Sequence, residues 1–156
     1  FTLPKPIIHR GGCNLSFAGL KTAVLKISKK IKNKEEKYHL AASFQKTIED
    51  ILCEKSKFAM SLFKENYNSE KNTFVIAGGV ASNNKIRKKL IDLSIQNNFE
   101  PVFPPINLCS DNAAMIAWTG IERFRLGLLN KLDFPVKARW SLDEKAPFLK
   151  GAGIKF

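Results

Sequence analysis

Residues 73–126 alternate between short apolar runs and stretches of helical period, and this order constrains the fold more than any other feature of the sequence. The first run, 73–77 (TFVIA), is β-branched and apolar and ends at a glycine pair, which predicts a buried strand and a tight turn. Apolar residues at helical spacing follow, and then comes a second extended run, 100–103, closed by two prolines. A further helix is expected over about 112–126. Strand, helix, strand and helix in this order predict an α/β fold with parallel pairing of the two strands.

The residues before this segment are expected to be mostly helical. Residues 1–14 carry prolines and a Gly-Gly pair and are interpreted as a loop or an edge segment. Between 17 and 31, apolar residues recur every three or four positions, as on one face of a helix. Residues 35–67 continue this period as one long helix or two joined helices, whose aromatic stripe is expected in the core. The other side and the end of the first helix are rich in lysine: Lys21, Lys26, Lys29, Lys30 and Lys32. A solvated lysine face and a surface that contacts an RNA backbone both fit this pattern.

Length and composition indicate an ordinary folded domain. A chain of 156 residues, 44% apolar and 26% charged, can bury a core, and residues 1–156 are assigned to a single domain. No apolar run approaches the roughly 18 to 20 residues that span a bilayer, and the first residues do not resemble a leader peptide. A cytoplasmic location without membrane association is therefore expected. Three widely spaced cysteines, Cys13, Cys53 and Cys109, form no CxxC pair and predict neither a disulfide framework nor a zinc knuckle.

The formal net charge of +12 favours phosphate-bearing partners, because such a surplus attracts polyanions and steers their approach. The sequence is also rich in Lys, Asn and Ile together, which a bias toward A and T codons produces without any selection for binding. On charge alone, both explanations stay open.

Polar and glycine residues gather where the two expected strands end. In parallel α/β sheets, ligands bind beyond the carboxyl ends of the strands. Gly78 and Gly79 would let a ligand approach the backbone closely, and Asn83, at the start of the next helix, could offer its amide to a sugar or a carbonyl group. Asp111 follows the second extended run and is expected on the same edge of the sheet. A tight turn without a ligand is the alternative explanation for the glycine pair.

Asp111 stands before what is interpreted as a buried apolar helix, and three roles fit its carboxylate. It could cap the helix N-terminus, where a carboxylate gains roughly 0.3 to 1 kcal/mol from the helix dipole. It could ligate Mg²⁺, Zn²⁺ or iron, since carboxylate oxygens suit these metals. It could also act as a general base. The physical chemistry of the residues alone favours the cap.

Four strings in the chain resemble, in order, motifs of one family. They are LSFAGLKTAV (15–24), AASFQ (41–45), VIAGGVASNNKIRKKL (75–90) and LCSDNAAMIAWTGIERFRLG (108–127). They are similar to the carboxyl-terminal half of the tRNA N6-threonylcarbamoyladenosine transferase family, whose bacterial members were formerly called glycoproteases or O-sialoglycoprotein endopeptidases. The similarity continues to the tail at 138–140 (ARW).

The resemblance implies a fold and a site. The fold is that of the actin-like ATPases, with two lobes around a central cleft, and this chain would be its helix-rich carboxyl-terminal part. The donor would be threonylcarbamoyl-AMP, and the acceptor would be N6 of the adenosine adjacent to the tRNA anticodon. Asp111 would be a ligand of one divalent metal ion, iron or zinc, while Asn83, Gly78 and Gly79 would bind the donor. No residue is assigned a catalytic role of its own.

Other features of the family are not found in this sequence. The remaining metal ligands of the family are two histidines four residues apart on a helix of the amino-terminal lobe, and His9 and His39 do not fit that spacing. The phosphate-binding Ser-Gly-Gly turn and the sugar-binding acidic residue are also missing. Since a metal site needs about three protein ligands, the chain is expected to be an inactive piece that needs the amino-terminal lobe and other proteins of the threonylcarbamoyladenosine pathway. An incomplete sheet edge would also favour a homo-oligomer.

A second hypothesis is a non-catalytic basic module that binds tRNA or a protein partner through its lysine face. The older endopeptidase function is not favoured, because the sequence has no HExxH motif and no Cys and His placed as a nucleophile and base.

Overall fold

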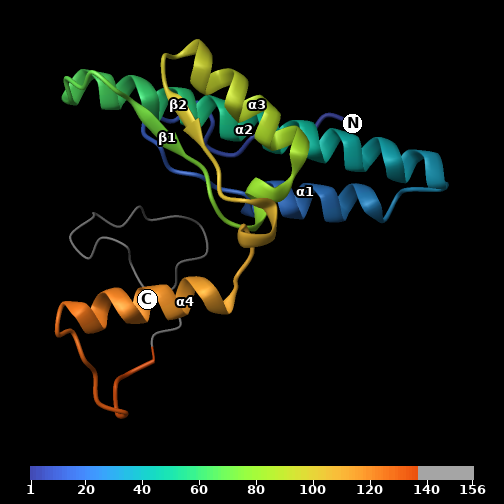
Figure 1. Ribbon diagram of the computed structural model, residues 1–156. Coiled ribbons are helices and arrows are strands. Elements are labelled where there is room, and N and C mark those ends of the chain that lie inside the picture. The colour runs from blue at the N-terminus through green and yellow to red at the C-terminus, as the bar shows by residue number, and fades with distance from the viewer. Residues whose placement is uncertain (137–156) are drawn as a thin grey trace. The chain divides into compact units, whose positions relative to one another are not determined.

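Two compact units make up the chain, residues 1–112 and residues 113–156. A computed structural model describes residues 1–136, so the second unit is known from residues 113–136 (Figure 1). The 138–140 tail lies outside the described residues. The assignment of residues 1–156 to a single domain stays a prediction.

The first unit contains three helices, two strands and two short 3-10 turns. In chain order these are α1 (Ala18–Ser28), α2 (Lys34–Asn66), β1 (Thr73–Val75), η1 (Gly79–Ser82), α3 (Asn84–Gln96), β2 (Glu100–Val102) and η2 (Ile106–Leu108). The second unit contains α4 (Ala113–Arg125). The predicted order of strands and helices is confirmed, and residues 35–67 form one helix rather than two. None of the helices among residues 1–136 is both long and apolar enough to cross a membrane.

The two strands pair in parallel, as predicted. Thr73 lies opposite Glu100 and Val75 opposite Val102, and α3 makes the connection between the strands. The prediction of a fully buried first strand is wrong, because the side chain of Val75 is 63% exposed. The reason is that residues 1–112 supply only two strands, and Phe74 and Pro101 are half-buried while Val75 and Val102 on the alternate positions are exposed.

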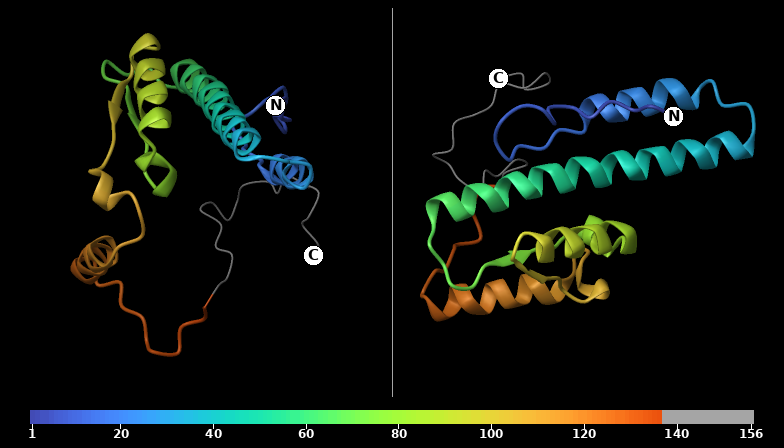
Figure 2. Two further views of the ribbon diagram at one scale, coloured as in Figure 1. Left: turned by 90° about the vertical axis from the view of Figure 1, so that its right-hand side faces the viewer. Right: turned by 90° about the horizontal axis from the view of Figure 1, so that it is seen from above.

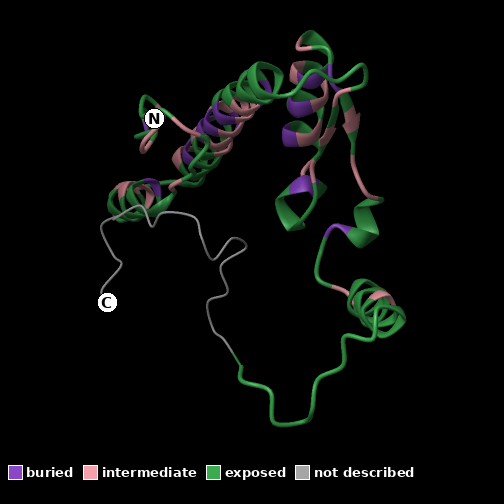
Figure 3. Ribbon diagram, turned by 90° about the vertical axis from the view of Figure 1, so that its left-hand side faces the viewer, coloured by how far each residue is buried: buried purple, intermediate pink, exposed green. Residues whose placement is uncertain are grey.

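The main core lies between the amino-terminal segment, α1 and α2. Its buried residues are Leu3, Leu20, Leu40 and Ile51, with Val24, Ile27, Ile31, Ile48 and Ile8 packed around them. The helical period of the sequence therefore identified the buried face of α1 correctly. The expectation that the aromatic stripe of α2 lies in the core is wrong, because Phe44, Phe58 and Phe63 are exposed. Other positions of α2 are buried (Figure 3), namely Leu40, Thr47, Glu49, Ile51, Lys55 and Met60.

The long helix α2 is the central element of the first unit. Its start is fixed by Asn33, whose Oδ1 accepts a hydrogen bond from the backbone N–H of Glu36 at 2.8 Å. The helices α1 and α3 lie on opposite sides of α2 (Figure 2). On α3, the buried residues Ile86, Leu90 and Ser94 form one stripe.

The helix α4 has no buried residue, so the expectation of a buried helix after Asp111 is wrong. The physical reason is that residues 113–136 contain no other helix or strand that could cover its apolar side chains. Gly127, at a φ of +69°, follows the helix end and fits the left-handed conformation common after helices.

Side chains of α2 fasten the amino-terminal segment. Lys55 is buried and donates hydrogen bonds from Nζ to the carbonyl oxygens of Arg10 at 2.6 Å and Gly12 at 3.1 Å. Asp50 forms ion pairs with Lys5, at 2.8 Å, and with Lys46. Burial alone would raise the pKa of the Asp50 carboxyl group, but the hydrogen bonds from Lys46 and Lys5 outweigh it and hold that pKa below its usual range.

The Asp50 pairs predict a pH-dependent contribution to stability. The folded pKa lies below the unfolded value of about 3.9, so the stabilisation is present above about pH 4 and is lost as the pH falls through the folded pKa. Replacement Asp50→Asn should lower the free energy of unfolding at pH 7 by up to about 1 kcal/mol. Urea unfolding at several pH values checks this, with the exposed Glu54→Gln as control. A difference between wild type and Asp50→Asn that grows toward acidic pH would contradict the assignment.

Candidate functional site

The glycine pair after β1 leaves a stretch of backbone open to a ligand. Gly78 has φ +91° and ψ 170°, a conformation that essentially only glycine adopts. A Cβ atom placed on Gly78 or on Gly79 would meet no heavy atom within 4 Å. Close packing therefore does not explain either glycine, and both leave room beside the backbone for another molecule.

Asn83 ends the η1 turn and caps α3. Its side-chain Oδ1 accepts hydrogen bonds from the backbone N–H groups of Lys85 at 3.0 Å and Ile86 at 3.2 Å. Within residues 1–112, the Nδ2 group of Asn83 makes no hydrogen bond, so it can donate to a ligand whose position is set by the cap. The expectation that Ser82 or Asn83 caps this helix is confirmed for Asn83.

The segment after β2 lies beside the glycine turn. The η1 and η2 turns contact one another, and Ile76 donates its backbone N–H to the Val102 carbonyl oxygen at 3.0 Å just beyond the paired strands. The prediction that the glycine pair and the segment leading to Asp111 share one edge of the sheet is therefore supported. The side chain of Asp111 is exposed and forms no ion pair with another residue of 1–112.

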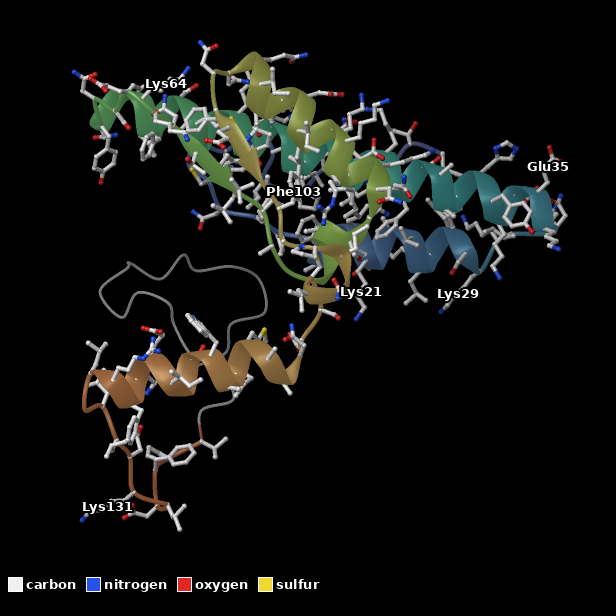
Figure 4. The ribbon with its side chains drawn as sticks, viewed as in Figure 1. Lys21, Lys29, Glu35, Lys64, Phe103 and Lys131 are labelled. Carbon is white, nitrogen blue, oxygen red and sulfur yellow. The ribbon has the colours of Figure 1, made fainter. Side chains whose placement is uncertain are left out.

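The side chain of Arg87 joins the two segments, and the sequence reasoning missed it. Its Nε donates to the Ala81 carbonyl oxygen at 3.0 Å, and Nη2 donates to the Pro104 carbonyl oxygen at 3.1 Å and to Cys109 Sγ at 3.3 Å. The guanidinium also lies over the ring of Phe103, 4.5 Å from its centroid. Phe103 comes directly after β2 (Figure 4). One side chain thus holds η1 and the segment leading to Asp111 together. The available signal was that Arg87 is the only arginine in a helix rich in lysine, since arginine's planar fork suits several acceptors at once.

The residues present do not form a metal site on their own. Among residues 1–136, no group of three His, Cys, Asp or Glu side chains is placed to hold a metal ion. His39 lies on the surface of α2, where its Nε2 is 3.5 Å from a carboxylate oxygen of Glu35, and His9 is exposed in the amino-terminal segment. Asp111 could supply one ligand, but a site needs about three.

Comparison with known proteins identifies the family of the chain. A family model described as tRNA N6-adenosine threonylcarbamoyltransferase matches residues 1–118. The chain belongs to this family. Among curated relatives of that name, the protein of Pelagibacter ubique is 63% identical over 155 residues, covering 99% of this chain and 43% of the relative. The protein of Zymomonas mobilis is 46% identical, covering 98% and 41%, and that of Rhodospirillum rubrum is 43% identical, covering 98% and 43%.

The chain therefore spans less than half the length of these threonylcarbamoyltransferases. The matched residues include both strand ends, the Gly78–Gly79 pair, Asn83 and Asp111. Within the part that is shared with the family, the candidate site is thus the edge of the sheet that Arg87 fastens.

The glycine pair offers a matched test of backbone strain. Replacement Gly78→Ala should lower the free energy of unfolding by about 1 to 3 kcal/mol, because alanine does not adopt this φ and ψ without strain. Gly79→Ala, whose Cβ has equally open space and no positive φ, should stay within about 0.5 kcal/mol of wild type. Urea unfolding measures both, and equal losses would argue against a strained turn at Gly78.

The Arg87 contacts predict a loss of stability on substitution that a lysine at this position does not fully restore. Arg87→Met should lower the free energy of unfolding by about 2 to 3 kcal/mol, because partly buried carbonyl acceptors lose charged donors. Arg87→Lys should recover at most part of this, since one ammonium group lacks the fork that reaches Ala81 and Pro104 together. Arg10→Met, on an exposed side chain, is the control. Amide hydrogen exchange should quicken in 79–82 and 106–109 in the Arg87 variants alone. Unchanged exchange in these residues would rule out the link that Arg87 makes between the two segments.

Proposed function

We propose that this chain is the carboxyl-terminal part of an enzyme that transfers the threonylcarbamoyl group from threonylcarbamoyl-AMP to N6 of the adenosine adjacent to the tRNA anticodon. The proposal rests on the family of the chain and on one observation in it: open backbone at Gly78 and Gly79 lies directly before Asn83, whose amide is fixed by capping and retains free donors. The proposed whole has the two-lobed fold of the actin-like ATPases.

The donor is proposed to bind at the carboxyl end of β1. Gly78 and Gly79 allow its approach to the backbone, and the Nδ2 group of Asn83 donates a hydrogen bond to one of its oxygens. The N-terminus of α3 carries a partial positive charge that favours an anionic group such as the phosphate of the adenylate. In the transfer, the N6 amine attacks the carbamoyl carbonyl carbon, the new C–N bond forms, the bond to the phosphate oxygen breaks, AMP leaves and the amine loses a proton.

Asp111 is proposed to supply one ligand of a divalent metal ion, iron or zinc, with two histidines outside this chain completing the site. Such a metal would polarise the carbonyl group as a Lewis acid. The chain alone is then inactive, because it lacks the remaining ligands. Its proposed partners are tRNA, threonylcarbamoyl-AMP, the amino-terminal lobe, other proteins of the pathway and a second copy of the chain. Its proposed location is the cytoplasm.

A non-catalytic tRNA-binding or partner-binding module is the second candidate. It is favoured by the charge of +12 and by exposed lysines on α1 and α3. The transferase and a tRNA-binding module both predict tRNA binding, whereas only the transferase predicts transfer, so the transfer reaction separates the candidates.

Transfer of labelled threonine from the adenylate donor to unmodified tRNA tests the proposed function in the full-length gene product. Asp111→Ala should lower the rate at least about 100-fold, equivalent to about 2.7 kcal/mol of transition-state stabilisation. Asp133→Ala, an exposed carboxylate outside the strand ends, should leave the rate within about twofold.

Asn83→Ala should raise the KM for the donor, and circular dichroism should show that each variant is folded. Residues 1–156 alone should transfer nothing. Full transfer by a folded Asp111→Ala variant would exclude the carboxylate as a ligand. No transfer by the full-length product would favour the binding module.

A further inference from the structure

The helices α2 and α3 enclose an open groove of about 550 Å³ whose lining is rich in lysine. Lys46 lines it from α2, and Lys85, Lys88 and Lys89 line it from α3. The three lysines of α3 follow the spacing of one helix face, so their side chains lie on the same side of the helix, toward α2.

Positive charges outnumber negative charges among the side chains that line this groove. Within residues 1–136, Lys85, Lys88 and Lys89 form no ion pair, whereas Lys46 is paired with Asp50. Two acids also line the groove. Glu49 is buried and accepts a hydrogen bond from Gln45 Nε2 at 3.1 Å, while Asp92 is exposed. Three exposed ammonium groups therefore converge on one concave surface with their charges available to a ligand.

The groove begins next to the candidate donor site. Asn83 caps the N-terminus of α3, and Lys85, Lys88 and Lys89 lie roughly 3, 8 and 9 Å further along the axis at 1.5 Å per residue. A polyanion that lies along these ammonium groups would pass within a few residues of Asn83. The spacing suits a nucleic acid backbone, whose phosphates repeat at short intervals and need no base readout to bind.

The lysines of α1 do not share this placement. Lys26 is exposed on α1, and Lys29 and Lys30 are exposed directly after its end. The helix α1 lies on the other side of α2 from α3 (Figure 2). The cavity between α1 and α2 is lined mainly by apolar side chains, among them Val24, Ile31, Leu40 and Phe44. The α1 lysines are therefore a matched control for the same charge change.

We propose that the groove between α2 and α3 holds the sugar-phosphate backbone of the tRNA through Lys85, Lys88 and Lys89, next to the site of the donor. This inference rests on the proposed function, because it takes tRNA as the acceptor. It assigns two tasks to α3: its N-terminus faces the donor and its flank holds the acceptor.

The test compares two triple variants of the full-length gene product. Binding of unmodified tRNA is measured by fluorescence anisotropy over a series of salt concentrations. The variant Lys85→Gln, Lys88→Gln, Lys89→Gln should bind at least about tenfold more weakly near 0.15 M salt, and the slope of log affinity against log salt should become shallower by about 2 to 3. The variant Lys26→Gln, Lys29→Gln, Lys30→Gln should bind within about twofold of wild type.

Transfer kinetics separate this inference from the proposed function. The groove variant should raise the KM for tRNA while the KM for threonylcarbamoyl-AMP stays unchanged. If the wild-type protein transfers threonylcarbamoyl and both triple variants bind tRNA equally well, the assignment of the groove to tRNA is overturned and the proposed function stands. An absence of wild-type transfer would overturn the proposed function, and the binding comparison would still decide whether the groove takes RNA. If the groove variant bound tRNA like wild type but no longer bound a protein partner, the inference would also be overturned.

Discussion

The arrangement of the candidate site depends on one guanidinium group. Two short parallel strands do not by themselves hold their following segments in place, because few residues pair and both segments lead away from the sheet. Arg87 donates to carbonyl oxygens in both segments and stacks on Phe103, so it supplies the link that strand pairing lacks. Arg87 lies on α3, four residues after the capping residue Asn83. The same helix therefore carries the capped N-terminus, the arginine that links the two segments and the lysines of the groove.

Strain and capping then set the local geometry within that frame. Gly78 takes a backbone conformation closed to other residues, which turns the chain sharply from β1 into η1. The side-chain Oδ1 of Asn83 accepts hydrogen bonds from backbone N–H groups of α3, and this orients the Nδ2 donors of the same amide. A side chain held this way loses little conformational freedom when a ligand binds, which is how a preorganised site gains affinity.

Much of this could be predicted from the sequence, for physical reasons that differ by residue. The helical period of Leu20, Val24 and Ile27 identified the face of α1 that packs against the core, because residues three and four apart share one side of a helix. The strand–helix–strand order predicted the shared edge, because parallel strands align their carboxyl ends. Arg87 could not be assigned, since its acceptors at Ala81 and Pro104 are backbone atoms whose positions depend on tertiary structure. The exposure of Val75 and Phe44 was missed because an apolar pattern states a preference for burial, while actual burial depends on the elements available to cover it.

The described residues separate binding from chemistry. The edge of the sheet offers open backbone, an oriented amide and a helix N-terminus, and a basic groove lies between α2 and α3. Each of these features is suited to binding a group without changing it. Asp111 is the one acidic side chain of the segment that follows β2, and it is exposed without an ion pair in residues 1–112. Under the proposed function, Asp111 contributes one metal ligand and the remaining ligands come from outside this chain, whereas recognition resides in α3 and in the turns that Arg87 holds.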